Sequence, residues 1–152
     1  MDTNLIGIAG VHHVVSELSR RGVIALPTVK NTAAYDIIAV NVAGTSHANI
    51  QVKTSSKRVP AFPMPEPEKI RTGKNDYYVL LRWVEKEQRY EVFLLKGAEA
   101  HKEVAASCNS QKRSVQAGTR KVISPCIRVS GAQGLKAKRW SDAWQKWLQP
   151  HP

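Results

Sequence analysis

Two strand-like segments joined by a short turn constrain the fold of this chain more than any other feature. Residues 35–42 (YDIIAVNV) are rich in β-branched side chains, and residues 48–54 (ANIQVKT) alternate between apolar and polar side chains. The GTS stretch between them is typical of a turn, so we expect the two strands to pair as a hairpin. Asp36 is a carboxylate inside the otherwise apolar first strand, and burying it is costly unless another group pairs with it.

The flanking segments predict a mixture of helices and further strands. Residues 5–21 are expected to form an opening helix, because apolar side chains recur along one face and Gly22 follows as a helix stop. Residues 59–75 contain four prolines and are expected to form a long loop without a regular element. The other predictions are strands at 77–84 and 90–95, a helix at 98–106, an edge strand at 121–129 and a tryptophan-striped helix at 137–148. Together these elements predict an α/β or α+β protein.

The charge of the chain indicates a polyanionic partner. Its 152 residues suit a single domain, and 23 Lys and Arg residues against 12 Asp and Glu residues give a formal net charge of +11. No acidic residue lies between Glu103 and Asp142, so the C-terminal segment, residues 104–152, is strongly basic. A face that contacts phosphates needs such segregation of charge, while a merely soluble basic surface is the alternative interpretation.

The apolar runs and the cysteines of the sequence indicate the cellular compartment of the protein. The longest apolar runs span only a few residues, which excludes a membrane-spanning helix, and the N-terminus lacks the basic region of a secretory signal. The two cysteines, Cys108 and Cys126, match neither a disulfide framework nor a zinc pattern. We therefore expect a cytoplasmic protein whose cysteines are reduced and lie in its core.

A candidate site arises where the two hairpin strands meet. Gln51 and Lys53 are two residues apart on the second strand, so they share one face, and strand pairing brings Asp36 near them. A carboxylate and an amide oxygen suit Mg²⁺, and a lysine beside them can position a water and balance the charge of a phosphate. The alternative is an Asp36–Lys53 ion pair with an ordinary polar Gln51.

Three strings in this order resemble the PD-(D/E)xK nuclease superfamily: GVHHVVSELSRRG, then NTAAYDIIAV, then IQVKTSSKR. More narrowly, the chain is similar to a group of small bacterial members with a QVK motif, and the later YYVLLRW and YEVFLL strands are similar as well. The resemblance implies a restriction-endonuclease-like fold with a central mixed β-sheet flanked by helices. We expect one such domain over residues 1–152, with the proline-rich loop at about 59–75 and the basic segment at about 104–152.

The resemblance also implies roles for the candidate residues. Asp36 matches the metal-bridging aspartate, Lys53 the catalytic lysine and Gln51 the second acidic position, and the backbone carbonyl of Val52 completes the shell of Mg²⁺ (or Mn²⁺). The implied activity is metal-dependent endonucleolytic hydrolysis of DNA phosphodiester bonds. Enzymes of this fold often dimerise to cut both strands, so the resemblance leaves room for a homodimer.

Polar and basic residues outside the triplet are candidate nucleic-acid contacts. Hydroxyls and a basic pair follow the second strand, and a second basic pair lies in the acid-free stretch. For the first group, an ordinary polar turn is the alternative interpretation. The candidates are Ser55, Ser56, Lys57, Arg58, Lys112 and Arg113.

Two departures from the family pattern open a second interpretation. Related sequences carry Glu where this chain has Val11, and Gln51 replaces a second acid. Glu17 is a possible substitute for the helix acid, although pairing with Arg21 or His13 on the same helix is the alternative. With one carboxylate left, the alternative function is a catalytically impaired protein of nuclease fold that binds nucleic acid or a protein partner.

Overall fold

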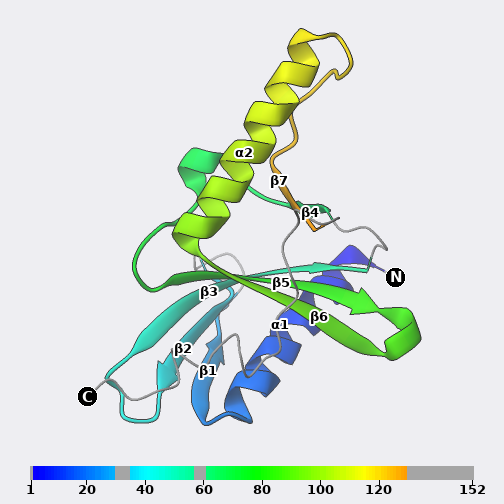
Figure 1. Cartoon of the computed structure of the whole chain (residues 1–152). Helices are drawn as coiled ribbons and strands as arrows, with labels where there is room; N and C mark the ends of the chain where they lie inside the picture. Colours follow the sequence, from blue (N-terminus) through cyan, green and yellow to red (C-terminus); the bar gives the residue numbers. More distant parts are fainter. Residues whose placement is uncertain (1, 30–34, 57–60, 130–152) are drawn as a thin grey trace.

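The structure is a computed structural model that describes residues 2–29, 35–56 and 61–129 (Figure 1). One five-stranded mixed sheet dominates it, in the order β1-β2-β3-β5-β6. The central pair β3 and β5 is parallel, and the other neighbours are antiparallel. The strands of this sheet are β1 (Val23–Pro27), β2 (Ile37–Asn41), β3 (His47–Ser55), β5 (Asp76–Val84) and β6 (Arg89–Lys96).

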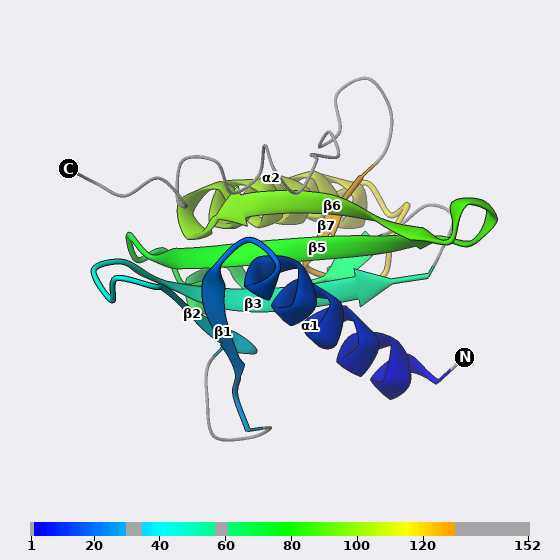
Figure 2. The same cartoon turned by 90° about the horizontal axis from the view of Figure 1, so that it is seen from below.

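Helices cover the two faces of the sheet. Helix α1 (Thr3–Ser19) packs on one face, against β1 and β3, and helix α2 (Gly97–Gln116) lies on the other face (Figure 2). A small sheet made of β4 (Ala61–Pro63) and β7 (Cys126–Arg128) lies on the side of α2. Two short 3₁₀ turns, η1 (Pro67–Lys69) and η2 (Glu85–Glu87), complete the elements. The predicted mixed sheet flanked by helices is confirmed.

The opening helix forms where its apolar stripe predicts it. The Asp2 side chain caps its first turn by accepting from the Asn4 amide at 2.8 Å. Val14 and Leu18, one turn apart, are fully buried against the sheet. Gly22 then adopts φ +77°, a backbone conformation that glycine adopts readily, and the chain enters β1.

The sheet separates two apolar cores because side chains alternate along its strands. On the α1 side, Ile50 of β3 and Val79 of β5 are fully buried, and on the α2 side Tyr78 and Leu80 of β5 are buried. The helix approaches β3 closely at Gly10, where an added Cβ would lie 1.9 Å from Thr54 Oγ1. These two cores fix which side chains of β3 remain available for chemistry.

Several sequence predictions need correction. The segment 59–75 is not a continuous loop, because β4 and η1 lie within it and β4 pairs with β7. The helix expected at 98–106 extends to Gln116, and the edge strand expected at 121–129 is only three residues long. Its strand partner is β4 in the small sheet. The tryptophan-striped helix expected at 137–148 lies outside the described residues.

Two further predictions concern the membrane and the cysteines. Within the part of the chain that the structure describes, no helix is both long and apolar enough to cross a bilayer. Cys108 and Cys126 are free and buried, as expected for core thiols, and burial raises the pKa of Cys108.

Candidate active site

The candidate site lies where β2 separates from β3. The backbone amide of Asp36 donates to the Ile50 carbonyl at 2.9 Å, and regular pairing of β2 with β3 begins at the next residue. Beyond that bond the Asp36 side chain replaces the β2 backbone as the hydrogen-bond partner of β3. Its Oδ2 accepts from the Val52 amide at 2.7 Å and from Gln51 Nε2. The carboxylate therefore satisfies a β3 backbone donor that β2 no longer reaches, and it contacts the predicted Gln51 directly.

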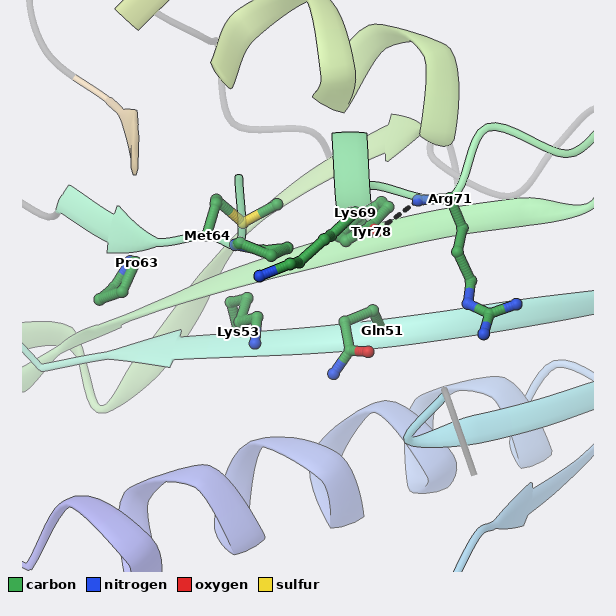
Figure 3. A pocket seen from close by; sticks show the side chains of 8 residues that line it. Gln51, Lys53, Pro63, Met64, Lys69, Arg71 and Tyr78 are labelled. Atoms are coloured by element: carbon green, nitrogen blue, oxygen red, sulfur yellow. Dashed lines mark hydrogen bonds between the residues drawn. The ribbon is translucent and has the colours of Figure 1, made fainter. Parts of the chain in front are cut away.

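Gln51 and Lys53 share one face of β3, as their spacing predicts. Both are half-buried, whereas Ile50 and Val52 between and beside them are buried on the α1 side. The two polar side chains line a hollow of about 390 Å³ on the α2 side, which we call the cationic hollow (Figure 3). It is lined by Gln51, Lys53, Pro63, Met64, Pro65, Lys69, Arg71 and Tyr78.

A second hollow opens on the α1 side of the sheet, next to the hydrogen bond between Asp36 and Gln51. It runs from the N-terminal half of α1 to the start of β2, and Asp36 and Val52 line it together with Val11 and His12. Val11, the helix position at which the resemblance leads us to expect an acid, thus lines the same hollow as Asp36, and its side chain is apolar. Asp36 lines this hollow, Gln51 lines the cationic hollow, and the two side chains are hydrogen-bonded to each other.

Glu17 belongs to a different part of the helix. Its Oε2 accepts from Arg21 Nη1 at 2.5 Å, and its Oε1 lies 3.7 Å from Arg20 Nη1. Glu17 lines neither hollow. The expected helix pairing with Arg21 is thus present, and among the described acids only Asp36 lines either hollow.

A buried carboxylate that sequence reasoning missed supports the site from behind. Asp76 is 7% exposed, and its Oδ1 accepts from the Tyr35 hydroxyl at 3.0 Å and from Asn49 Nδ2 at 2.9 Å. Its Oδ2 accepts from the Gly73 amide at 2.9 Å. Tyr35 immediately precedes Asp36, so this network holds the chain at the point where β2 separates. No local signal links residues 35 and 76, which are 41 positions apart.

The environment of Asp76 keeps it charged. Burial by itself raises the pKa of a carboxyl group. The hydrogen bonds from Asn49, Tyr35 and Gly73, together with the charge of Arg71, outweigh burial and hold the pKa of Asp76 below its usual value. The group is therefore an anion at neutral pH, and it anchors its donors through charge-assisted hydrogen bonds.

The remaining predicted nucleic-acid contacts are spread over the molecule. Ser55 ends β3 and is buried, Ser56 is exposed, and Lys57 and Arg58 lie outside the described residues. Lys112 and Arg113 are exposed on α2, and Lys112 borders a separate hollow that includes Cys108. None of these described residues lines the cationic hollow, which is formed by Lys69 and Arg71 in addition to Lys53.

The candidate ligands at the site are all oxygen atoms, which suit a hard cation, but only one of them belongs to a charged group. The Asp36 carboxylate, the Gln51 amide oxygen and the Val52 carbonyl are ligands of the type that Mg²⁺ prefers. The Gln51 nitrogen, not its oxygen, faces Asp36, so metal binding requires the amide to turn over. In the described part of the chain, no group of three or more His, Cys, Asp or Glu side chains is placed to hold a metal ion.

Comparisons with known proteins identify the fold. No protein-family model matches the chain, and no curated protein matches it in sequence. Among solved structures, a bacterial homing endonuclease is similar with a TM-score of 0.52 and 16% identity, over 97% of this chain and 92% of that one. The Holliday junction resolvase of Archaeoglobus fulgidus gives a TM-score of 0.44 and 20% identity, over 60% of this chain and 73% of that one. The predicted restriction-endonuclease-like fold is confirmed.

Proposed function

We propose that this chain is a metal-dependent endonuclease that hydrolyses DNA phosphodiester bonds. The observation that carries the proposal is the direct contact of Asp36 with Gln51 and the Val52 amide, with Lys53 following on the same face as Gln51. The structural neighbour that spans nearly the whole chain is by its description an endonuclease, which supports the assignment. The net charge of +11 supports a polyanionic substrate.

In this proposal the metal ion binds at the point where β2 separates from β3. Asp36, the Gln51 amide and the Val52 carbonyl would hold Mg²⁺ or Mn²⁺ there. When bound, the ion supplies Lewis-acid stabilisation of the charge that develops on the phosphate. The Val52 carbonyl is available because, in a strand, the amide and the carbonyl of one residue point to the same side, and the Val52 amide points to Asp36.

Lys53 contributes a charge and three hydrogen-bond donors. Its ammonium group opens into the cationic hollow beside Gln51, where it can orient a water and hold a non-bridging phosphate oxygen. The half-buried position of Lys53 reduces competition from bulk water, so the interaction with a phosphate is stronger than at an exposed lysine. Lys53→Ala is therefore expected to abolish hydrolysis.

The test is cleavage of supercoiled and branched DNA by the purified chain in Mg²⁺ or Mn²⁺, with RNA as a parallel substrate. We expect nicking of DNA that disappears in Lys53→Ala and in Asp36→Ala. Lys86→Ala, at an exposed lysine in η2, is the control and should keep full activity. Absence of nicking, or nicking that survives Lys53→Ala, sinks the proposal.

A second candidate is a protein of this fold that binds nucleic acid, or a protein partner, without cutting. It is favoured by Val11 at the helix position and by Gln51, whose amide already satisfies Asp36 without a metal. Metal titration by calorimetry separates the two functions. Binding of Mg²⁺ or Mn²⁺ that is lost in Asp36→Ala supports the enzyme, whereas salt-sensitive DNA binding without measurable metal binding supports the binder.

We further propose a homodimer as the working form, because cutting both strands of a duplex requires two sites. Analytical ultracentrifugation of the full chain, alone and with duplex DNA, measures the number of copies. A monomer under both conditions contradicts this part of the proposal without affecting single-strand nicking.

A further inference from the structure

We propose that Lys69 and Arg71 form a phosphate subsite for the backbone of a nucleic-acid strand, next to the phosphate that Lys53 serves. The inference rests on the proposed function, since it places the strand relative to the same site. Neither residue was a candidate from the sequence, because both lie in the proline-rich segment. In the structure the part of this segment from Ala61 onwards passes over the α2 side of β3 and brings Lys69 and Arg71 into the cationic hollow (Figure 3).

The side chains of the cationic hollow suit the phosphates of a nucleic-acid backbone. Three of its lining side chains are cationic, namely Lys53, Lys69 and Arg71, and none is acidic. Like charges in one hollow repel each other, and an anion between them relieves this repulsion. The walls contributed by Pro63 and Met64 are apolar, so their side chains offer the cations no strong competing hydrogen-bond acceptor.

Arg71 is held in place before any ligand arrives. Its guanidinium lies over the Tyr35 ring, 4.9 Å from the centroid, and Nη1 donates to the Tyr35 hydroxyl at 3.3 Å. Its backbone amide donates to the Tyr78 hydroxyl at 3.2 Å. Tyr35 in turn donates to the buried Asp76 at 3.0 Å. A cation ordered in this way loses less conformational entropy on binding a phosphate than a free side chain loses.

The same network couples Arg71 to the reacting centre. Tyr35 contacts Arg71 through its side chain and is bonded through the backbone to Asp36, which contacts Gln51. The position of the subsite relative to the carboxylate is therefore fixed by the fold. Lys53, Lys69 and Arg71 all line the cationic hollow, so a strand that passes through it can place successive phosphates against them (Figure 3).

Lys69 is available for a phosphate despite an existing ion pair. Its Nζ lies 2.8 Å from Glu66 Oε2, and the two side chains are 71% and 57% exposed. The hydrogen bond to Glu66 raises the pKa of Lys69, which keeps the ammonium charged. Exposed pairs of this kind contribute little to stability, so a phosphate can replace Glu66 at low cost.

The test measures DNA binding by fluorescence anisotropy in EDTA, so that cleavage plays no part. A short labelled duplex is titrated with wild type, with Lys69→Ala/Arg71→Ala and with the control Lys86→Ala/Lys102→Ala, which removes the same charge from exposed positions outside the hollow. We expect the Lys69→Ala/Arg71→Ala variant to bind roughly ten-fold more weakly or worse. Its slope of log affinity against log salt should be smaller by about 0.9 for each lost phosphate contact.

The single variant Lys69→Ala distinguishes a lost phosphate contact from misfolding of the double variant. Lys69→Ala removes an exposed side chain in η1 and leaves the Arg71–Tyr35 contact intact, so it should keep the wild-type melting temperature and lose about one contact from the salt slope. Inorganic pyrophosphate is the second probe, and weak competition with the duplex is the expected result. Tight binding of pyrophosphate without duplex binding identifies a small phosphate ligand and overturns the subsite for a strand.

The inference and the proposed function fail in different ways. If the Lys69→Ala/Arg71→Ala and Lys69→Ala variants bind duplex with the affinity and salt slope of the control, the subsite is wrong, whether or not the chain cuts DNA. If wild type binds through Lys69 and Arg71 but never nicks in Mg²⁺ or Mn²⁺, the subsite stands and the nuclease function is wrong.

Discussion

Replacing Gln51 with Glu tests whether Gln51 and Asp36 form one site. In the structure Gln51 Nε2 donates to Asp36 Oδ2, and Gln51→Glu replaces this donor with a second carboxylate. The lost charge-assisted hydrogen bond is worth about 1.5–3 kcal/mol. Two carboxylates about 4 Å apart repel by about 4 kcal/mol at an effective dielectric constant of 20, and partial exposure of both groups reduces this value.

We therefore expect Gln51→Glu to lose about 2–4 kcal/mol of stability without metal. For a chain of this size that loss lowers the melting temperature by roughly 5–15 °C. A cation that both carboxylates hold should restore it, because a ligand present at a hundred times its dissociation constant stabilises by about 2.7 kcal/mol. Added Mg²⁺ should consequently raise the melting temperature of the Gln51→Glu variant more than that of wild type.

The assay is thermal unfolding followed by circular dichroism, with EDTA and with Mg²⁺. Gln116→Glu, at an exposed residue at the end of α2, makes the same change of charge and should show neither the loss nor the Mg²⁺ response. If Gln51→Glu melts like wild type in EDTA and does not respond to Mg²⁺, Asp36 and Gln51 do not form one site.

Three further substitutions test the helix packing, the buried anchor and the missing acid. Gly10→Ala should cost about 1–3 kcal/mol in urea unfolding, because the new methyl would lie 1.9 Å from a β3 side-chain atom, whereas Gly7→Ala, with nothing within 4 Å, should be neutral or stabilising. Asp76→Ala should cost about 2–4 kcal/mol, since it leaves buried donors unpaired. Because the pKa of Asp76 is lowered in the folded state, its contribution to stability is present above about pH 4 and is lost as pH falls through the folded value. Asp76→Ala should therefore reduce the dependence of stability on pH in the acid range. Val11→Glu adds a carboxylate to the hollow that Asp36 lines and should tighten Mn²⁺ binding measured by calorimetry; unchanged affinity would place Val11 outside the site.

The parts of the fold set by local patterns could be predicted from the sequence. Alternation along residues 48–54 predicts the faces of β3, and the apolar stripe of the opening helix predicts its buried side, because both patterns follow from backbone geometry. The parallel pairing of β3 with β5 was not predicted, since it joins strands separated by the proline-rich segment. Its register depends on contacts that no local window contains.

Helix α2 shows why a polar segment can be underestimated. Its second half lacks an apolar stripe, so the sequence pattern predicts a helix only as far as residue 106. The structure buries Gln111 there, and its amide accepts from the Ser124 amide at 2.8 Å and donates to the Ser124 carbonyl at 2.9 Å. A polar side chain that is satisfied by the following segment replaces the expected apolar one, and sequence periodicity does not reveal such a partner.

In the candidate site, too, some residues could be predicted from local sequence patterns and others could not. The faces of Gln51 and Lys53 followed from strand alternation, and the contact with Asp36 followed from hairpin pairing. Lys69 and Arg71 enter the site from a segment whose path is fixed by β4, by η1 and by the contact of Arg71 with Tyr35. Tertiary contacts of this kind leave no periodic signal in the sequence.

The central claim is that Asp36, Gln51 and Val52 hold the metal of a nuclease. The most direct measurement is the anomalous diffraction of Mn²⁺ in crystals of the full chain. We expect a peak in direct coordination with the Asp36 carboxylate and the Val52 carbonyl, with the Gln51 amide turned so that its oxygen faces the ion. Crystals in saturating Mn²⁺ that show no peak there, and an unchanged hydrogen bond from Gln51 to Asp36, would contradict it.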